Sequence, residues 1–88
     1  MILYKMNNNI IEKFVETIRR KNSNVRIHFK KRSTFTGRFI ITADYTEMKS
    51  KNFWRIVPES RLEEWQSTKD LSLSRLFNGA EFTRLTDD

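Results

Sequence analysis

The basic side chains of this sequence gather in one stretch. Between Thr17 and Ala43 the chain carries eight Lys or Arg residues together with His28, and it carries no Asp or Glu. Like charges this close repel one another, so an anion that neutralises them would relieve a cost to stability. Lys and Arg bind nucleic acid largely through its phosphates, without base contacts. The stretch therefore predicts an anion-binding surface, and a solubilising charged face without a partner is the alternative.

No catalytic or metal-binding pattern accompanies these cations. The chain has one His and no Cys, which excludes thiolate catalysis and a zinc site built from several His or Cys ligands. Its two glycines are 42 residues apart and cannot form a phosphate-binding loop. Glu63 and Glu64 are adjacent and would not face one another on a helix. Asp44 and Glu47 could share a helical face, but nothing near them indicates a substrate pocket. The sequence predicts a protein that is not an enzyme and has no cofactor or metal.

The length and composition predict one small folded domain. The 88 residues include seven Phe, two Trp and 38% hydrophobic residues, with only two Gly and one Pro, which argues against disorder. We expect a flexible segment over 1–8, a domain over 9–85 and a frayed end over 86–88. The opening residues 1–6 are too short for the apolar region of a signal peptide, so none is expected, and the sequence has no run of about 18 apolar residues. The sequence thus predicts a soluble cytoplasmic protein without a membrane partner.

An amphipathic helix is expected first, over Asn9–Lys21. Its apolar stripe is formed by Ile10, Ile11, Phe14, Val15 and Ile18. Asn9 with Glu12 would form a capping box at its start.

A strand hairpin follows, because the apolar period changes to two. Val25, Ile27 and Phe29 alternate with Arg26, His28 and Lys30. After a charged turn over 30–33, a second strand is expected over Thr34–Thr42. Its inward face would carry Phe35, Gly37, Phe39 and Ile41. Gly37 in mid-strand predicts a bulge or a tight bend.

The second half of the chain is less regular. Asp44–Lys51 is expected to be a loop or a single helical turn, and Phe53–Val57 a strand that ends at Pro58. Arg61–Gln66 fits a short helix capped by Ser60 and Glu63, or a return strand. The remaining predicted elements are a helix over 70–77 that Asp70 caps and that stops at Asn78-Gly79, and a closing strand over Ala80–Leu85 with Phe82 buried.

These elements predict an α+β fold, with an N-terminal helix packed on a small, curved antiparallel sheet. The candidate nucleic-acid-binding residues are Arg19, Arg20, Arg26, His28, Lys30, Lys31, Arg32, Arg38 and Trp54. Alternation sends Phe53 and Trp54 to opposite faces. Core packing is the favoured role of Trp54, but an exposed Trp54 beside Arg55 would stack on a nucleotide or anchor a protein partner.

The helix and hairpin resemble the start of Sm-like proteins, including the Hfq type. The resemblance covers residues 10–48. It is carried by Val25-x-Ile27-x-Phe29 and Phe35-x-Gly37-x-Phe39, followed by Asp44 and Met48. It implies a small five-stranded, strongly bent sheet, ring assembly and RNA binding. SH3-like barrels offer a comparable core, so a partly closed barrel of either kind is expected, and no binding residue is transferred from the family.

Two functions fit the sequence. The first is a non-enzymatic module that docks nucleic-acid phosphates on the hairpin over 26–38, with RNA slightly preferred over DNA. The alternative is a protein-interaction or assembly module without a nucleic-acid role. Residues 1–57 sum to +9 and residues 58–88 to −3, so the two halves could pair between subunits of a homo-oligomer or with a protein partner.

Overall fold

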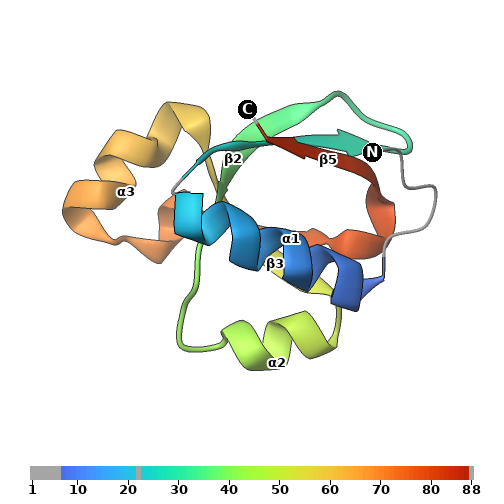
Figure 1. Cartoon of the computed structure of the whole chain (residues 1–88). Helices are drawn as coiled ribbons and strands as arrows, with labels where there is room; N and C mark the ends of the chain where they lie inside the picture. Colours follow the sequence, from blue (N-terminus) through green and yellow to red (C-terminus); the bar gives the residue numbers. More distant parts are fainter. Residues whose placement is uncertain (1–6, 22, 88) are drawn as a thin grey trace.

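The fold is a helix packed on one five-stranded antiparallel sheet, as the sequence predicts (Figure 1). The computed structural model describes residues 7–21 and 23–87, except for the side chains of residues 19–21 and 87. The elements in chain order are α1 (Asn8–Lys21), β1 (Val25–Phe29), β2 (Phe35–Phe39), α2 (Tyr45–Ser50), β3 (Phe53–Pro58), the 3-10 helix η1 (Glu59–Arg61), α3 (Leu62–Thr68), η2 (Leu71–Leu73), β4 (Arg75–Asn78), η3 (Gly79–Glu81) and β5 (Phe82–Asp87). The strand order is β4-β3-β2-β1-β5, so β4 and β5 form the two edges of an open sheet, and among the described residues no pairing between them closes it into the barrel considered from the sequence.

The N-terminal helix α1 begins at Asn8, one residue before the predicted start. Its cap is Asn7, whose Oδ1 accepts a hydrogen bond from the Ile10 amide at 3.0 Å. The predicted capping box of Asn9 and Glu12 is therefore wrong, because Asn9 already lies inside the helix. The Glu12 carboxylate instead accepts a charged hydrogen bond from Lys49 of α2 and ties the two helices together. The predicted flexible segment 1–8 falls on residues 1–6, which lie outside the described residues, and on Asn7 and Asn8.

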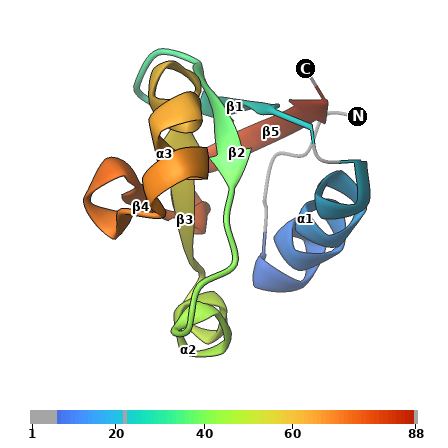
Figure 2. The ribbon, with the colours of Figure 1, turned by 90° about the vertical axis from the view of Figure 1, so that its left-hand side faces the viewer.

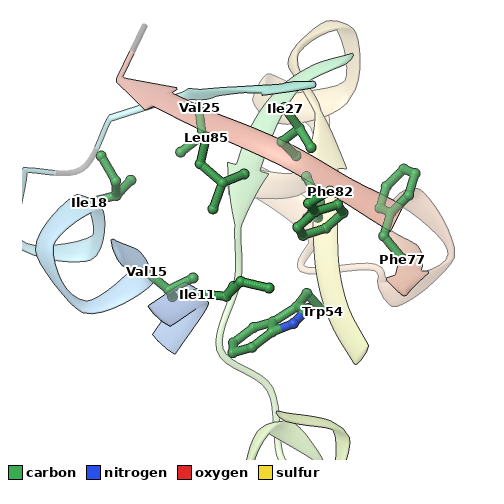
Figure 3. Close-up of a cluster of buried hydrophobic side chains, with 10 residues drawn as sticks. Ile11, Val15, Ile18, Val25, Ile27, Trp54, Phe77, Phe82 and Leu85 are labelled. Carbon is green, nitrogen blue, oxygen red and sulfur yellow. The ribbon is translucent and has the colours of Figure 1, made fainter. Parts of the chain in front are cut away.

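The main core lies between α1 and one face of the sheet (Figure 3). It consists of Ile11, Val15, Ile18, Val25, Ile27, Trp54, Ile56, Phe77, Phe82 and Leu85. Figure 2 shows α1 on one side of β2 and β3 and α3 on the other. Ile56 and Val57 are adjacent in β3 and therefore point to opposite faces, yet both are fully buried. The sheet is thus covered on both sides along β3, by α1 and by the segment that contains α3.

Gly37 sits in a regular part of the ladder, opposite Val25 of β1 and Pro58 of β3. A Cβ at this position would lie 2.5 Å from the Val57 carbonyl oxygen. The glycine therefore permits a close approach of β2 and β3, and the bulge predicted as one alternative is absent at this position. The register shift of the sheet lies elsewhere, between His28 and Phe29 on the β5 side of β1.

Strand β2 is shorter than predicted and ends at Phe39. Beyond that residue the alternation no longer holds. Ile40 is buried, and Ile41, which was expected to point inward, is 39% exposed.

The predicted helix over 70–77 is wrong. This segment forms η2 and then strand β4, which pairs antiparallel with β3. Asp70 does act as a cap, since its Oδ1 accepts from the Ser72 amide at 3.0 Å. Gly79 does not end a helix with a positive φ angle. Gly79 is buried, and a Cβ there would lie 2.2 Å from Asn52 Oδ1, so the position has no room for a side chain.

The remaining expectations for the second half are mostly confirmed. Of the two alternatives after Pro58, the structure has the helix, α3, although Ser60 does not cap it. Strand β5 contains the buried Phe82 and runs to Asp87, where it pairs with Val25. The frayed end expected over 86–88 is therefore wrong for 86–87, because backbone pairing with β1 holds them, and Asp88 lies outside the described residues.

The short helix α2 is fixed to β3 by an ion pair. Arg55 donates from Nη2 to Asp44 Oδ2 at 2.8 Å and from Nε to Oδ1 at 3.2 Å. Together with a hydrogen bond from Thr42, the Arg55 guanidinium lowers the pKa of Asp44 to about 2. Of the two acidic residues considered for catalysis, Asp44 is thus engaged by Arg55 and Glu47 by Lys51, at 3.4 Å.

Candidate nucleic-acid interface

The candidate interface is built on the basic hairpin, which we define as β1, the turn 30–34 and β2. Along β1, Val25 and Ile27 are buried in the core while Arg26 is exposed and His28 is half-buried. Arg26 pairs in register with Thr36 of β2 and Thr86 of β5. The alternation predicted from the sequence therefore gives this hairpin one apolar and one basic face.

The turn of the basic hairpin carries three exposed cations, Lys30, Lys31 and Arg32. The Arg32 guanidinium lies 5.0 Å from the ring centre of Phe29 and 5.5 Å from that of Phe77. Cation–π attraction of this kind orients the guanidinium without neutralising its charge. None of the carboxylates that the structure describes forms an ion pair with these three residues.

His28 is held between Arg84 of β5 and Thr34. Arg84 Nη2 lies 3.2 Å from His28 Nε2, and Thr34 Oγ1 lies 3.3 Å from His28 Nδ1. Because a guanidinium can only donate, Nε2 must accept, and the proton of the neutral ring sits on Nδ1. Burial and the charges of Arg84 and Arg26 lower the pKa of His28 below 6.5. The imidazole is therefore neutral at pH 7.

The other predicted cations have different positions. Arg38 is half-buried, and its Nε donates to Asn24 Oδ1 at 3.2 Å, which orients it toward the segment that precedes β1. Arg19 and Arg20 belong to the last turns of α1, but their side chains lie outside the described part of the chain. Their predicted place on the interface stays a prediction.

Trp54 is a core residue, which confirms the role favoured from the sequence, and its place among the candidate nucleic-acid-binding residues is wrong. Only 1% of its surface is exposed, and its ring meets Phe39 and Tyr45 edge to face. Its indole Nε1 donates to Asn52 Oδ1 at 2.9 Å. The ring lies against α1 and cannot reach a base (Figure 3). Trp54 lies on the inward face of β3, and its neighbour Phe53 is half-buried.

Two arginines that were not singled out from the sequence lie close to the basic hairpin. Arg84 lies opposite His28 on β5, and its Nε is buried without a hydrogen-bond partner among the described residues. Arg75, on β4, lies with its guanidinium 6.0 Å from the Phe35 ring centre. Both are isolated cations in the acidic half of the chain. The pairing of β5 with β1 brings Arg84 beside the basic hairpin, and the contact with the Phe35 ring brings Arg75 there. The sequence held one indication of the position of Arg84, because this residue lies within the predicted closing strand.

The described residues contain no group of three or more His, Asp or Glu side chains that could hold a metal ion. No helix in the described part of the chain is long and apolar enough to cross a membrane. No family model, curated protein or solved structure matches this chain.

Proposed function

We propose that this protein is a non-enzymatic nucleic-acid-binding module that docks phosphates on the basic hairpin, with RNA preferred over DNA. One observation carries the proposal. Lys30, Lys31, Arg32 and Arg84 lie along β1, its turn and the adjacent β5, and the described residues provide none of them with a carboxylate partner. When such cations neutralise the phosphates of a nucleic acid, the counterions condensed on it are released, and this release contributes binding free energy.

The neutral His28 supports the same surface. The His28 ring, which can take up a proton, contacts the Arg84 guanidinium. The Nε atom of Arg84 is buried and has no hydrogen-bond partner among the described residues. A phosphate oxygen at this point would accept from Arg84 and favour the charged imidazole. We also propose that the likeness to Sm-like proteins is one of fold, which a helix followed by a five-stranded antiparallel sheet supports.

Reversal of the turn charges is expected to abolish binding. We expect the variant Lys30→Glu, Lys31→Glu, Arg32→Glu to lose at least about 100-fold in affinity for a labelled single-stranded RNA at 50 mM salt, because three phosphate contacts are replaced by repulsion. Each lost contact should also lower the slope of the affinity against salt concentration, on logarithmic scales, by about one. Fluorescence anisotropy against single-stranded RNA, single-stranded DNA and duplex DNA measures this. Because Arg32 packs on Phe29 and Phe77, the double variant Lys30→Glu, Lys31→Glu is measured beside it.

A matched control separates the site from the net charge. Lys13, Lys51 and Lys69 are exposed and lie outside the basic hairpin, and their replacement by Glu changes the net charge equally. This control is expected to keep most of the affinity. Equal losses in the two triple variants would mean nonspecific attraction and would contradict the site. Absence of binding by the unaltered protein at low salt would contradict the function itself.

Protonation of His28 is expected to tighten RNA binding. A bound phosphate raises the pKa of His28 above its lowered value in the free protein, so binding takes up a proton and affinity rises as pH falls from 7.5 to 5.5. Less than about tenfold is expected, since tenfold corresponds to a full pKa unit. The groups facing His28 are Arg84, Arg26 and Thr34. Anisotropy titrations at both pH values measure the ratio, which His28→Gln should bring close to one. A ratio unchanged in His28→Gln would assign the effect to another group.

An assembly module is the second candidate, favoured by a separate observation. Strands β4 and β5 leave both edges of the sheet open, and Leu71 and Leu76 at one of them are 47% and 45% exposed. Edges of this kind accept a further strand from another chain. A mass in solution that rises with protein concentration, in a protein that binds no nucleic acid, would favour this candidate.

A further inference from the structure

A cavity at the end of β3 is lined by two arginines that the proposed function does not use. Its volume is about 300 Å³, and it is lined by Pro58, Arg61, Ser72, Leu73 and Arg75. We call it the Arg61–Arg75 pocket. Its lining residues come from the segment where the chain leaves the sheet through η1 to form α3 and returns through η2 into β4. Four separate elements therefore bring its walls together.

The part of the chain that the structure describes lines the Arg61–Arg75 pocket with two arginines and no carboxylate. Arg75 rests on the Phe35 ring, 6.0 Å from its centre, and has no carboxylate partner among the described residues. Arg61 Nη1 lies 3.6 Å from Glu64 Oε1, in an ion pair whose side chains are both more than half exposed. An exposed pair at that separation is weak. Arg61 is therefore available to exchange Glu64 for a better anion.

The rest of the pocket wall is ordered and partly apolar. Leu73 is 8% exposed, so Leu73 and Pro58 contribute only a small apolar area to a mostly polar wall. The Ser72 amide and hydroxyl donate to Asp70, which lowers the pKa of that carboxyl. This fixes the η2 turn that carries Ser72 and Leu73. Two lining residues contact carboxylates, Ser72 with Asp70 and Arg61 with Glu64, and both carboxylates oppose an anion.

We propose that the Arg61–Arg75 pocket binds a phosphomonoester. Two guanidinium groups match the charge and the oxygen geometry of a phosphate dianion better than those of a single carboxylate. A cavity of this size is at the lower limit for small-molecule sites and holds a phosphate with a compact organic group, which the Pro58 and Leu73 surface would contact. The phosphomonoester has two sources, a free phosphorylated small molecule or the 5′-terminal phosphate of a nucleic-acid strand. None of the pocket residues belongs to the basic hairpin, so the proposal stands apart from the proposed function.

The probes are adenosine 5′-monophosphate, adenosine, and one short RNA with and without a 5′-phosphate. Amide chemical shifts of the ¹⁵N-labelled full chain locate each probe. Adenosine monophosphate is expected to shift the amides of 59–62 and 71–75, and adenosine is expected to leave them unchanged. A free small molecule as the source predicts that the monophosphate binds at least as well as the RNA. A strand terminus as the source predicts that the 5′-phosphorylated RNA binds better than the monophosphate and that the unphosphorylated RNA does not shift these amides.

Single substitutions test the two arginines. Arg61→Gln and Arg75→Gln are each expected to weaken binding of the tightest probe about ten- to hundredfold, as for loss of a charged hydrogen bond. Arg75→Lys keeps the charge without the fork and is expected to fall in between. Glu64→Gln frees Arg61 and should tighten binding about two- to fivefold, the range for an exposed ion pair. Lys13→Gln, on exposed α1 surface, is the control for one lost charge and should change nothing.

The outcomes separate this proposal from the proposed function. Lys30→Glu, Lys31→Glu should leave monophosphate binding to the pocket intact, even where it abolishes RNA binding to the hairpin. If neither the monophosphate nor the 5′-phosphate of the RNA shifts the amides of 59–62 and 71–75, the pocket proposal is overturned. It is equally overturned if Arg61→Gln and Arg75→Gln bind as the unaltered protein does.

Discussion

Replacement of Trp54 by alanine is expected to lower the free energy of unfolding by about 3–5 kcal/mol. The Trp54 side chain is among the largest that are fully buried, and it joins α1, α2 and β3 through contacts in the main core. Its removal leaves a cavity and also leaves Asn52 Oδ1 without the indole donor. Because a chain of this size has a modest total stability, the variant should be largely unfolded at 37 °C. Urea denaturation followed by circular dichroism measures the change.

Two further variants test whether the loss of stability comes from the buried Trp54 ring. Trp54→Phe keeps most of the apolar contact but loses the hydrogen bond to Asn52, and we expect a loss of about 1–2 kcal/mol. Trp65→Ala removes a tryptophan that is only half-buried, on α3, beneath the Lys69 ammonium. Its loss should be well below that of Trp54→Ala. A similar midpoint for Trp54→Ala and the unaltered protein would contradict the placement of Trp54 in the core.

Introduction of a single methyl group at Gly37 is the second large effect that we expect. The Cβ of Gly37→Ala would lie 2.5 Å from the Val57 carbonyl oxygen and 2.8 Å from Ile56 Cγ2. The carbonyl belongs to the backbone of β3 and cannot rotate away, so β2 and β3 must move apart. Overpacking of this kind costs about 1–3 kcal/mol or more, which exceeds the entropic gain of about 0.4–1 kcal/mol from replacing a glycine. The net loss should appear as a lower melting temperature in calorimetry.

Thr36→Ala provides the comparison for Gly37→Ala. Thr36 is the neighbouring residue of β2 and is half-buried opposite Arg26, on the basic face. Its truncation removes atoms without creating a clash and should change the melting temperature by only about 1–2 °C. A melting temperature of Gly37→Ala that equals or exceeds that of the unaltered protein would show that β2 and β3 tolerate a wider separation.

The elements that the sequence predicted well are those with a long or regular apolar period. Helix α1 has five apolar residues on one stripe, and β1 has three that alternate with polar neighbours. Both patterns are local, and both were confirmed within one residue. The basic face of the hairpin followed directly from the same alternation, since the residues between the core positions of β1 are Arg26 and His28.

The elements that were missed depend on distant parts of the chain. Leu73, Leu76 and Phe77 have helical spacing, but β4 is four residues long and receives its backbone hydrogen bonds from β3. A local pattern cannot anticipate that pairing. Arg84 was missed for a related reason. The register shift opposite His28 and Phe29 inserts Thr83 and changes the phase of β5, so that Phe82 points into the core while Arg84 faces His28. Simple alternation would have put both residues on one face.

The place of β5 in the sheet also determines how the chain can fold. Strands β1 to β4 pair with their neighbours in sequence and can form one hairpin after another. Strand β5 instead pairs with β1, and the contact between Arg84 and His28 joins residues 56 positions apart. Closing so long a loop has an entropic cost before any contact compensates for it, so we expect this pairing to form late. Until it forms, one edge of β1 is unpaired and the core lacks Phe82 and Leu85 of β5. A growing chain therefore passes through a stage in which its basic hairpin is formed but its core is still open.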